Sequence, residues 1–378
     1  MKGMRVLYLV LALSSLIGLP SCDDDEGHQI GTLSLGLTDA STDDYQAVYV
    51  TIAQVEVHMP EGSLKVVGRP NTTYNLLDLA NGVRKNLGFA ELKAEDYTEM
   101  RLLVGNTSDG KINILGQQHP FANYVIDLDG VPHELKIPSE FQGGVEILHG
   151  FTISDKQTTE LNLDFSASES VVVGGNSGTW FLNPTIRVLN TQEYSIVTGT
   201  VNDVTGRPFS GVLVSAQVND TSASDIKNRV VIEASTITDE RGRYTSFINP
   251  GTYTLVSYRA GFNPVVECAV SLTGGQVTEA HDFTLTSVRT GTVSGNVIIA
   301  GADFEQFATI SFRQIVNCGG TDTEIEIKSL NVIRNGFYSI ELPVGFYDAV
   351  VSTPGKVSVI LENVEVKAGL NTNLPITM

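Results

Sequence analysis

Three glycine-centred landmarks in the C-terminal half of the chain recur at one constant spacing, and this repeat limits the fold more than any other feature. Each recurs 94 residues later: Gly242, Gly251 and Gly261 reappear as Gly336, Gly345 and Gly355. Near the start of each copy, Gly199 has a counterpart in Gly295 at an offset of 96 residues. A constant offset indicates a duplicated domain. We therefore expect residues 194–287 and 289–378 to be two copies of one small fold, each closing its own core.

Short alternating apolar patterns run through the chain from residue 30 onward. Thr32–Leu37, Val48–Ile52 and Glu160–Phe165 each place their apolar side chains on one face, and Gly, Asn and Asp separate such runs. Period-two patterns at close spacing predict an antiparallel sandwich or barrel. One segment, Phe89–Met100, is rich in helix formers and is expected to hold a helical turn.

These patterns predict an all-β protein. Residues 30–190 are expected to form an N-terminal antiparallel β-sandwich-like domain, followed by two small tandem β-sandwiches over residues 194–287 and 289–378. The chain has 378 residues, of which 42% are hydrophobic, and this is enough to fill a core in each domain.

The charge balance excludes one class of partner. The chain carries 24 Lys and Arg against 43 Asp and Glu, a net charge of −19 at pH 7. Such a surface repels phosphate backbones, so no nucleic acid is expected as a partner. Three cysteines are also too few for a disulfide scaffold.

Residues 1–21 have the pattern of a signal peptide. Lys2 and Arg5 lead into Val6–Leu19, an apolar run of 14 residues that is too short to span a bilayer. Cys22 follows within a Leu-x-Ser-Cys sequence that resembles the lipobox of bacterial lipoproteins. The resemblance implies cleavage before Cys22, acylation of Cys22 and attachment to the membrane through its acyl chains. An ordinary secretory signal is the alternative.

Residues 22–29 form an acidic tether. Asp23–Glu26 is an unbroken acidic run, and it resembles the address that follows the acylated Cys in surface lipoproteins of the Bacteroidetes group. The resemblance implies a lipid-anchored outer-membrane protein displayed on the cell surface, with the periplasmic face as the alternative. A run of carboxylates also forms a solvated tether without acting as an address.

A fixed order of short motifs runs through residues 30–190. The motifs are Leu37–Ala40, Val48–Ile52, Tyr74–Leu79, Ile137–Ser139, Leu163–Phe165 and Asn183–Val188. Together they resemble a bacterial and archaeal family catalogued only as a domain of unknown function, number four-three-eight-two. The resemblance implies an extracytoplasmic, mostly β domain with no established activity.

The glycine motifs of residues 194–287 have specific turn chemistry. Gly242 ends a tight turn in which glycine supplies a positive φ. Pro250-Gly251 suits a type II turn, and a positive φ is expected at Gly251 and at its equivalent, Gly345. These motifs resemble the carboxypeptidase regulatory-like domain, a small sandwich of the prealbumin or starch-binding-like type. Such domains commonly occur without a peptidase.

A zinc site is one candidate for chemistry. His58 and Glu61 match the His-x-x-Glu pair of metallocarboxypeptidases, and His149 is a candidate for the third ligand. Pro60 favours a turn here instead, and the catalytic fold of those enzymes needs long helices that this sequence lacks. No metal or other cofactor is therefore expected.

Asp39, Asp43 and Asp44 lie close together in one expected loop. Several loop carboxylates can bind calcium, but Asx turns between two strands account for the same residues. The spacing of an EF-hand is missing, which favours turns. Whether the loop binds calcium stays open at this point.

Three further features have two interpretations each. Trp180, the only Trp, would suit a sugar-stacking platform, but the apolar residues after it favour a core position. Gly174–Gly178 follows a strand without opening a helix, which favours a hairpin turn over a phosphate site.

Cys268 lies on an apolar strand face and is expected to be a small buried hydrophobe. A disulfide with Cys318 is the alternative in an oxidising envelope, although the two are not repeat equivalents.

The sequence contains no nucleophile elbow and no phosphate-binding loop. We therefore expect a non-catalytic cell-envelope lipoprotein that binds a glycan or an extracellular protein through its β-sandwich modules. Carbohydrate is the expected small ligand, by analogy with starch-binding sandwiches. An envelope hydrolase with an unrecognised carboxylate site, and a structural stalk or assembly subunit, are the alternatives.

Overall fold

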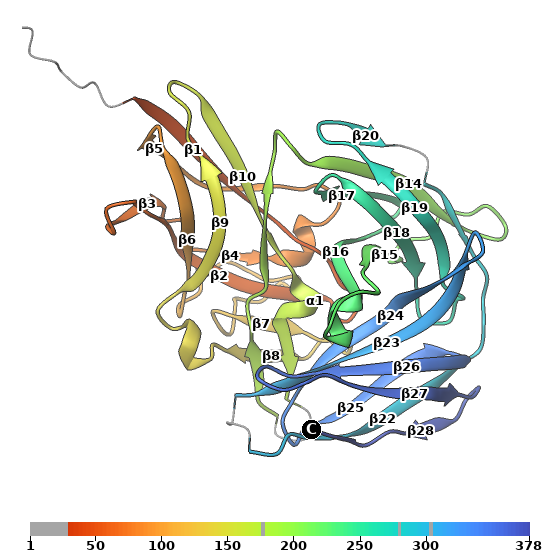
Figure 1. The fold of residues 1–378 in the computed structure, drawn as a ribbon. Coiled ribbons are helices and arrows are strands. Elements are labelled where there is room, and N and C mark those ends of the chain that lie inside the picture. The colour runs from red at the N-terminus through yellow and green to blue at the C-terminus, as the bar shows by residue number, and fades with distance from the viewer. Residues whose placement is uncertain (1–28, 175–177, 279–280, 302–304) are drawn as a thin grey trace, which may run out of the picture.

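The computed structural model describes residues 29–174, 178–278, 281–301 and 305–378, and most of them lie in strands (Figure 1). The all-β fold class is confirmed. The expected signal peptide and Cys22 lie outside the described residues, and so do the central residues of Gly174–Gly178. In the part of the chain that is described, no helix has the length and apolar character needed to cross a membrane.

In its described residues, 30–174 and 178–190, the N-terminal domain consists of strands, two 3-10 turns and one short helix. In chain order its elements are β1 (Ile30–Thr38), β2 (Ala47–His58), β3 (Leu64–Gly68), β4 (Thr72–Asn75), η1 (Leu76–Leu79), β5 (Lys85–Lys93), β6 (Asp96–Val104), β7 (Tyr124–Ile126), β8 (Pro132–Lys136), η2 (Ser139–Phe141), β9 (Val145–Thr152), β10 (Thr158–Phe165), α1 (Ala167–Ser170), β11 (Val171–Val173), β12 (Trp180–Leu182) and β13 (Ile186–Asn190).

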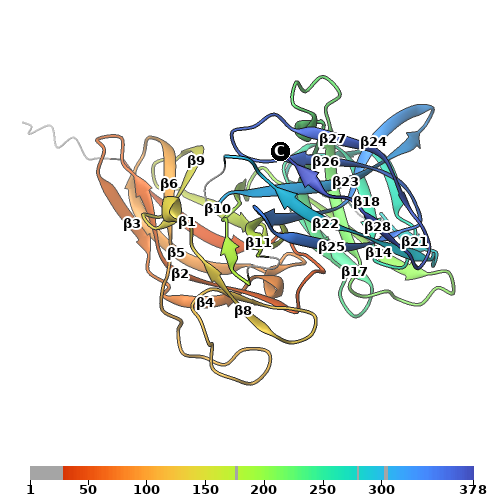
Figure 2. The same cartoon turned by 90° about the horizontal axis from the view of Figure 1, so that it is seen from below.

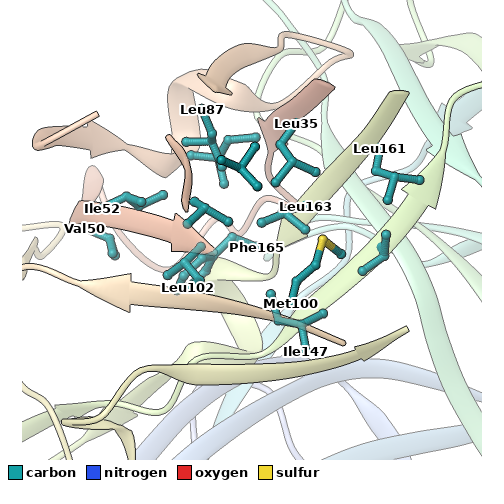
Figure 3. Packing of buried hydrophobic residues seen from close by; sticks show 14 of the residues in the cluster. Leu35, Val50, Ile52, Leu87, Met100, Leu102, Ile147, Leu161, Leu163 and Phe165 are labelled. Carbon is teal, nitrogen blue, oxygen red and sulfur yellow. The ribbon is translucent and has the colours of Figure 1, made fainter. Parts of the chain in front are cut away.

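Two sheets of this domain face one another across an apolar core. One has the strand order β13-β10-β1-β5, and the other runs β12-β8-β7-β2-β6-β9 with β3 and β4 paired to β2. Because strand side chains alternate, Leu35 of β1 and Leu163 of β10 point inward, where they join Ile52, Met100 and Ile147 from the facing sheet (Figure 3). The pairing of β1 with β10 is parallel, so this sandwich is mixed rather than purely antiparallel.

The helical turn expected in Phe89–Met100 is wrong, because this segment belongs to β5 and β6. Along β5, Ala90 and Leu92 are buried, whereas Phe89 and Glu91, which alternate with them, are exposed on the outer face. β5 pairs with β1, whose inner face supplies apolar partners for the buried residues. This tertiary packing outweighs the helix propensity of the segment.

Residues 194–287 form the middle sandwich, and residues 289–378 form the C-terminal sandwich. The middle sandwich contains β14 (Ser195–Asp203), β15 (Leu213–Asn219), η4 (Ile226–Arg229), β16 (Val230–Ile237), β17 (Arg243–Ile248), β18 (Gly251–Tyr258), β19 (Val265–Leu272), β20 (Val277–Thr278) and β21 (Phe283–Leu285). The C-terminal sandwich contains β22 (Thr290–Ile298), β23 (Phe307–Cys318), β24 (Thr321–Ile333), β25 (Phe337–Pro343), β26 (Gly345–Ser352), β27 (Val359–Val366), β28 (Asn371–Asn373) and β29 (Ile376–Thr377).

The strand orders of the two sandwiches correspond one to one. In the middle sandwich, β16-β15-β18-β19 forms one sheet, and β14 carries β17, β20 and β21 in the other. In the C-terminal sandwich, β24-β23-β26-β27 matches the first of these sheets, and β22 carries β25, β28 and β29. The duplication that the glycine spacing predicts is therefore present in the topology.

Equivalent tyrosines hold equivalent loops in the two sandwiches. The hydroxyl groups of Tyr244 and Tyr338 each donate a hydrogen bond of 2.7 Å to a backbone carbonyl. The same carbonyls pass close to Gly199 and Gly295, where an added Cβ would lie 1.9 and 2.2 Å from the carbonyl oxygen. Only glycine fits so close an approach. The two acceptors are the carbonyls of His281 and Leu374.

The expected backbone conformation is confirmed at Gly242, with a φ of 70°, but is wrong at Gly251, which is not among the residues with positive φ. Gly251 and Gly345 are the first residues of β18 and β26, so neither occupies a type II turn. Gly345 has a φ of 157°, close to extended backbone. A larger residue at Gly251 is disfavoured by steric crowding, because an added Cβ would lie 2.9 Å from the hydroxyl oxygen of Tyr253.

The two sandwiches pack against each other through a pair of equivalent polar residues. Gln217 of β15 and Arg313 of β23 each follow a β-bulge, and each donates a hydrogen bond of 3.0 Å to the serine two residues earlier. Gln217 also donates to the carbonyl of Glu326 and accepts from its N–H. Arg313 donates to two carbonyls of η4 in the middle sandwich. Both polar side chains are therefore hydrogen-bonded at the interface.

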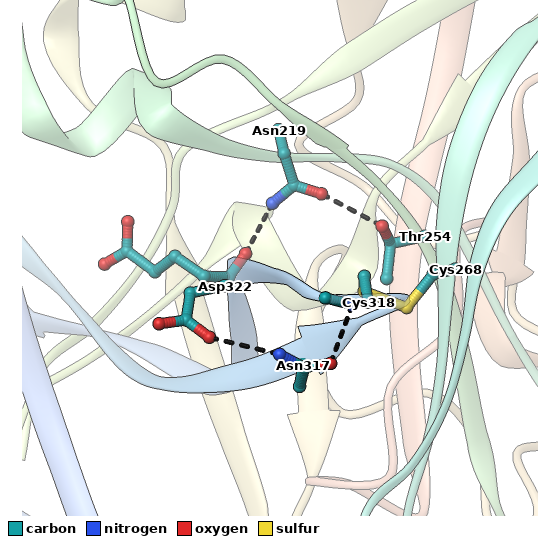
Figure 4. The surroundings of a disulfide bond; sticks show 8 residues. Asn219, Thr254, Cys268, Asn317, Cys318 and Asp322 are labelled. Atoms are coloured by element: carbon teal, nitrogen blue, oxygen red, sulfur yellow. Dashed lines mark hydrogen bonds between the residues drawn. A yellow bond between two sulfur atoms is a disulfide. The ribbon is translucent and has the colours of Figure 1, made fainter.

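A disulfide joins the same two sandwiches. Cys268 of β19 and Cys318 at the end of β23 are bonded, with 5.8 Å between their Cα atoms (Figure 4). The expectation that Cys268 is a buried hydrophobe is therefore wrong. A bulge in β19 places Ala269 at a φ of 57° and breaks the alternation on which that expectation depended. Gly319-Gly320 turns the β23–β24 hairpin and brings Cys318 to its partner.

β11 joins the N-terminal domain directly to the C-terminal sandwich. It pairs with β12 on one side and, in parallel, with β24 on the other, through Val172 with Asn331 and Val173 with Val332. One continuous sheet therefore runs from β27 through β24 and β11 to β9. Figure 2 shows the result from below, with the N-terminal domain beside the two sandwiches.

Candidate functional site

A cleft of about 350 Å³ lies where the N-terminal domain and the two sandwiches meet. Its walls come from α1, from η4 and the start of β16, and from the faces of β23 and β24. These elements meet here because β11 continues into β24 and because Arg313 holds η4 against β23. Small-molecule sites in proteins typically measure roughly 300–1,000 Å³, so the cleft is of ligand size.

The floor of the cleft consists of fixed polar side chains. Arg313, Glu326 and Asn331 are 2%, 9% and 5% exposed. The hydroxyl of Ser311 donates to the Glu326 carboxylate at 2.6 Å, and the hydroxyl of Thr309 donates to the Asn331 amide oxygen at 2.7 Å. Each group thus has a defined orientation before any ligand arrives, which lowers the entropic cost of binding.

The rim of the cleft is more exposed and chemically mixed. Lys227 and Asn228 on η4 are exposed, whereas Asn183 and Thr185 on the opposite wall are half-buried. Phe307, at the start of β23, is half-buried and is an aromatic residue of the lining. The rim therefore offers neutral hydrogen-bonding groups, one cation and one aromatic ring.

Both carboxylates of the cleft already have partners. Glu169 accepts two hydrogen bonds from Nη2 of Arg187, at 2.8 and 3.1 Å, and Glu326 accepts the bond from Ser311. Acid–base catalysis needs a carboxyl group that is positioned to exchange a proton with a substrate. The observed arrangement is better suited to hydrogen-bonded recognition of a polar ligand than to proton transfer.

The structure separates Asp39, Asp43 and Asp44, the three aspartates of the loop for which calcium binding was left open. Asp43 and Asp44 form ion pairs with Lys328 of β24, whose side chain is only 9% exposed. Asp39 lies elsewhere and accepts a hydrogen bond from the N–H of Ala167. The loop therefore joins the N-terminal domain to the C-terminal sandwich through a buried lysine, and removing its carboxylate partners would leave the buried charge unpaired.

Two of the three residues weighed as zinc ligands have other partners. His58 lies 3.2 Å from the Glu99 carboxylate, whereas Glu61 sits in the turn after β2 and accepts a hydrogen bond from Ser63. His149 is on β9. Within the described residues no group of three or more His, Cys, Asp or Glu side chains is arranged to hold a metal ion.

Trp180 is half-buried and packs against the core of the N-terminal domain. Its ring stacks on His133 with 4.5 Å between ring centroids, and it meets Tyr45 edge to face at 6.1 Å. This environment supports the core interpretation, because both contacts come from within the domain.

Sequence reasoning missed the cleft residues on β23 and β24. A signal was present in Thr309-Ile310-Ser311-Phe312-Arg313, where apolar and polar residues alternate and the polar face includes a charge. The apolar face fills the core of the C-terminal sandwich. The polar face is the one that meets the middle sandwich, and its burial could have been inferred only from a known partner surface.

Two families match separate parts of the chain. Residues 30–184 match the domain of unknown function DUF4382. Residues 196–286 match the carboxypeptidase regulatory-like domain. The regulatory-like domain is non-catalytic in kind, and neither match is to an enzymatic family. The matches thus identify one domain that is non-catalytic in kind and one whose function is unknown. Curated proteins provide no match to this sequence.

Three of the solved structures that match this chain do so at low sequence identity and low TM-score. The Bacillus anthracis TIE protein is 11% identical over 90% of this chain and 55% of its own, with a TM-score of 0.20. A streptococcal ancillary pilin is 10% identical over 92% and 98%, with a TM-score of 0.19. A cohesin–X-dockerin complex from Acetivibrio cellulolyticus is 16% identical over 25% and 59%, also at 0.19. This chain thus spans little more than half of the TIE and cohesin–X-dockerin chains, and scores this low say nothing about ligands.

Proposed function

We propose that this protein is a lipid-anchored protein of the bacterial outer membrane, displayed on the cell surface, that binds a glycan in the cleft between its three domains. The observation that carries the proposal is the cleft itself, a ligand-sized space with a preorganised polar floor. Neutral amide and hydroxyl groups on its walls match the alternating donors and acceptors of a sugar. Phe307 offers an aromatic surface for the apolar face of a sugar ring.

A glycan array followed by calorimetry tests this binding function. Asn228→Ala removes an exposed amide of the rim, and Phe307→Ala removes the aromatic ring. We expect each variant to bind the best glycan of the array at least tenfold more weakly, which corresponds to about 1.4 kcal/mol. Asn106→Ala, an exposed loop residue outside the cleft lining, is the matched control and should bind like the wild type. Absence of any glycan ligand, or equal affinity in all four proteins, would contradict the proposal.

The proposed anchor is Cys22, and its support is the basic start, the apolar run and the Leu-x-Ser-Cys ending. Cys22→Ala should leave the protein in soluble fractions and should abolish labelling by an alkynyl fatty acid. Unchanged labelling of the variant would exclude acylation at this residue.

The support for surface display is the acidic run Asp23–Glu26. Replacing the run by alanines should lower cleavage by external protease in whole cells while acylation persists. Equal cleavage of variant and wild type would mean that the run is only a solvated tether.

A further inference from the structure

A second, much smaller cavity lies between the N-terminal domain and the middle sandwich. Its volume of about 10 Å³ is that of roughly one water-sized sphere. The ends of β1 and β10 form one side of it, and β16 and β17 form the other. Two aspartates, Asp39 and Asp164, line the cavity.

Asp39 has an unsatisfied oxygen at this place. The residue follows β1 directly and is 5% exposed. Its Oδ1 accepts a hydrogen bond of 3.0 Å from the N–H of Ala167. Its Oδ2 is buried and has no hydrogen-bond partner among the described residues. A buried carboxylate oxygen without a partner is strongly unfavourable, so it indicates a missing ligand.

Asp164 is the second carboxylate of the cavity. It lies on β10 and is also 5% exposed, and no hydrogen bond or ion pair joins its side chain to another described residue. Arg187, its cross-strand neighbour on β13, offsets part of its charge. The Nη2 of Arg187 donates to the Glu169 carboxylate at 2.8 Å and to the carbonyl of Ile232 at 2.8 Å, whereas its Nη1 is buried without a hydrogen-bond partner among the described residues.

The charges around the cavity therefore do not balance. Asp39, Asp164 and Glu169 carry three carboxylates against the single guanidinium group of Arg187. Burial raises the pKa of Asp164 to about 6. Burial, together with the charge of Asp164, raises the pKa of Asp39 well above its usual range. One divalent cation would neutralise the excess and satisfy both free oxygens.

We propose that Asp39 and Asp164 bind one Ca²⁺ in this cavity, joining the N-terminal domain to the middle sandwich. Thr38, Thr245 and Ser246 line the same cavity and bring further hydroxyl and carbonyl oxygens. Ca²⁺ accepts six to eight oxygen ligands in flexible geometry, whereas Mg²⁺ normally keeps several of its waters. A space for one sphere has no room for those waters, so the site should select Ca²⁺.

Calorimetry and thermal melts test the proposal on the purified full chain after treatment with EDTA. We expect one Ca²⁺ to bind per chain and to raise the melting temperature by about 5 °C at a hundredfold excess over Kd. Mg²⁺ should bind at least tenfold more weakly. Absence of a calcium response in the wild type would overturn the proposal and would mean that the two carboxyl groups are neutralised by a proton instead.

The variant Asp164→Asn tests whether Asp164 is a calcium ligand or a residue with a purely structural role. The variant should lose the calcium response, and yet in EDTA it should melt no lower than the wild type, because the amide removes the repulsion with Asp39. Asp43→Asn is the matched control, since Asp43 pairs with Lys328 and should be unnecessary for the calcium response. Asp39→Asn serves as the second variant if Asp164→Asn does not fold. Calcium binding by both cavity variants at wild-type affinity would also overturn the proposal.

Discussion

The middle and C-terminal sandwiches share one strand order, yet their equivalent edge strands meet the N-terminal domain in different ways. The edge of β24 continues into β11 as one sheet. The region around the edge of β16 instead contacts the N-terminal domain through side-chain hydrogen bonds. The amide of Asn81 donates to the carbonyl of Ile237 and accepts from the N–H of Thr245. The hydroxyl of Ser235 donates to the carbonyl of Ser41. Edge strands expose unpaired backbone groups that a protein must cover. A duplicated fold can thus cover the same edge by two different means.

The two contacts differ in how sensitive they are to substitution. Strand pairing uses backbone groups that every residue except proline supplies, so the β11–β24 contact tolerates most substitutions. Side-chain contacts depend on the identity of single residues, so the β16 contact weakens when one of them changes. Four experiments test this contrast and the packing of the two sandwiches, beginning with the one that should have the largest effect.

Val172→Pro should break the backbone contact. Val172 is 1% exposed and pairs with both β12 and β24. Proline removes a backbone donor and does not fit an interior strand, so we expect the local stability of β24 to fall by about 3 kcal/mol or more. Hydrogen exchange should show faster exchange in β24 and unchanged exchange in β16. Equal loss in both strands would show that the two contacts form one cooperative unit.

Removing the disulfide should loosen the two sandwiches from each other. Cys268 and Cys318 close a loop with a sequence separation of 50. Replacing both by Ser should lower the free energy of unfolding by about 2–4 kcal/mol, chiefly because the unfolded chain gains entropy. Denaturant unfolding of the variant, with dithiothreitol-treated wild type as the control, measures this. Identical midpoints for oxidised and reduced protein would contradict it.

Asn81→Gly should weaken only the side-chain contact. Asn81 has a φ of 56°, which glycine also adopts, so the substitution removes hydrogen bonds without adding backbone strain. We expect a loss of about 2 kcal/mol, seen as faster hydrogen exchange in β16 and β17 but not in β24. Asn335→Gly is the matched control, because Asn335 has a φ of 58° and is exposed. A similar loss at Asn335 would mean that the Asn81 side chain contributes little.

Tyr244→Phe and Tyr338→Phe should have the smallest effects and should be equal. Each removes one hydroxyl that donates to a loop carbonyl, at 2.7 Å in both sandwiches. The expected cost is about 1 kcal/mol for each, and the two costs should add because the residues lie in separate cores. Thermal melts of both single variants and the double variant measure this. Strong non-additivity would show that the two copies are coupled through their shared interface.

The sequence predicted what depends on local pattern. Alternation indicated the all-β class because successive residues of a strand face opposite sides, and the glycine landmarks indicated the duplication because each copy repeats the same short local motifs. The close approach of backbone to Gly199 and Gly295 explains why these landmarks are glycine in both copies.

The features that were missed depend on residues far apart in the chain. β11 is three residues long, and nothing in it indicates pairing with a strand that begins at Thr321. The disulfide was disfavoured because its cysteines are not repeat equivalents, an argument that fails once the two copies pack face to face. Lys328 could not be assigned to Asp43 and Asp44 from spacing, since the ion pairs cross from one domain to another.

The position of β1 inside its sheet has a consequence for a protein held at its N-terminus, as we propose for this one. β1 lies between β10 and β5 and is hydrogen-bonded along both sides. A pull on the chain ahead of Ile30, directed along the strand, loads these bonds together in shear rather than opening them one after another. The first strand after the tether is therefore a force-bearing joint, and drag on a captured ligand would reach the anchor without unravelling the domain.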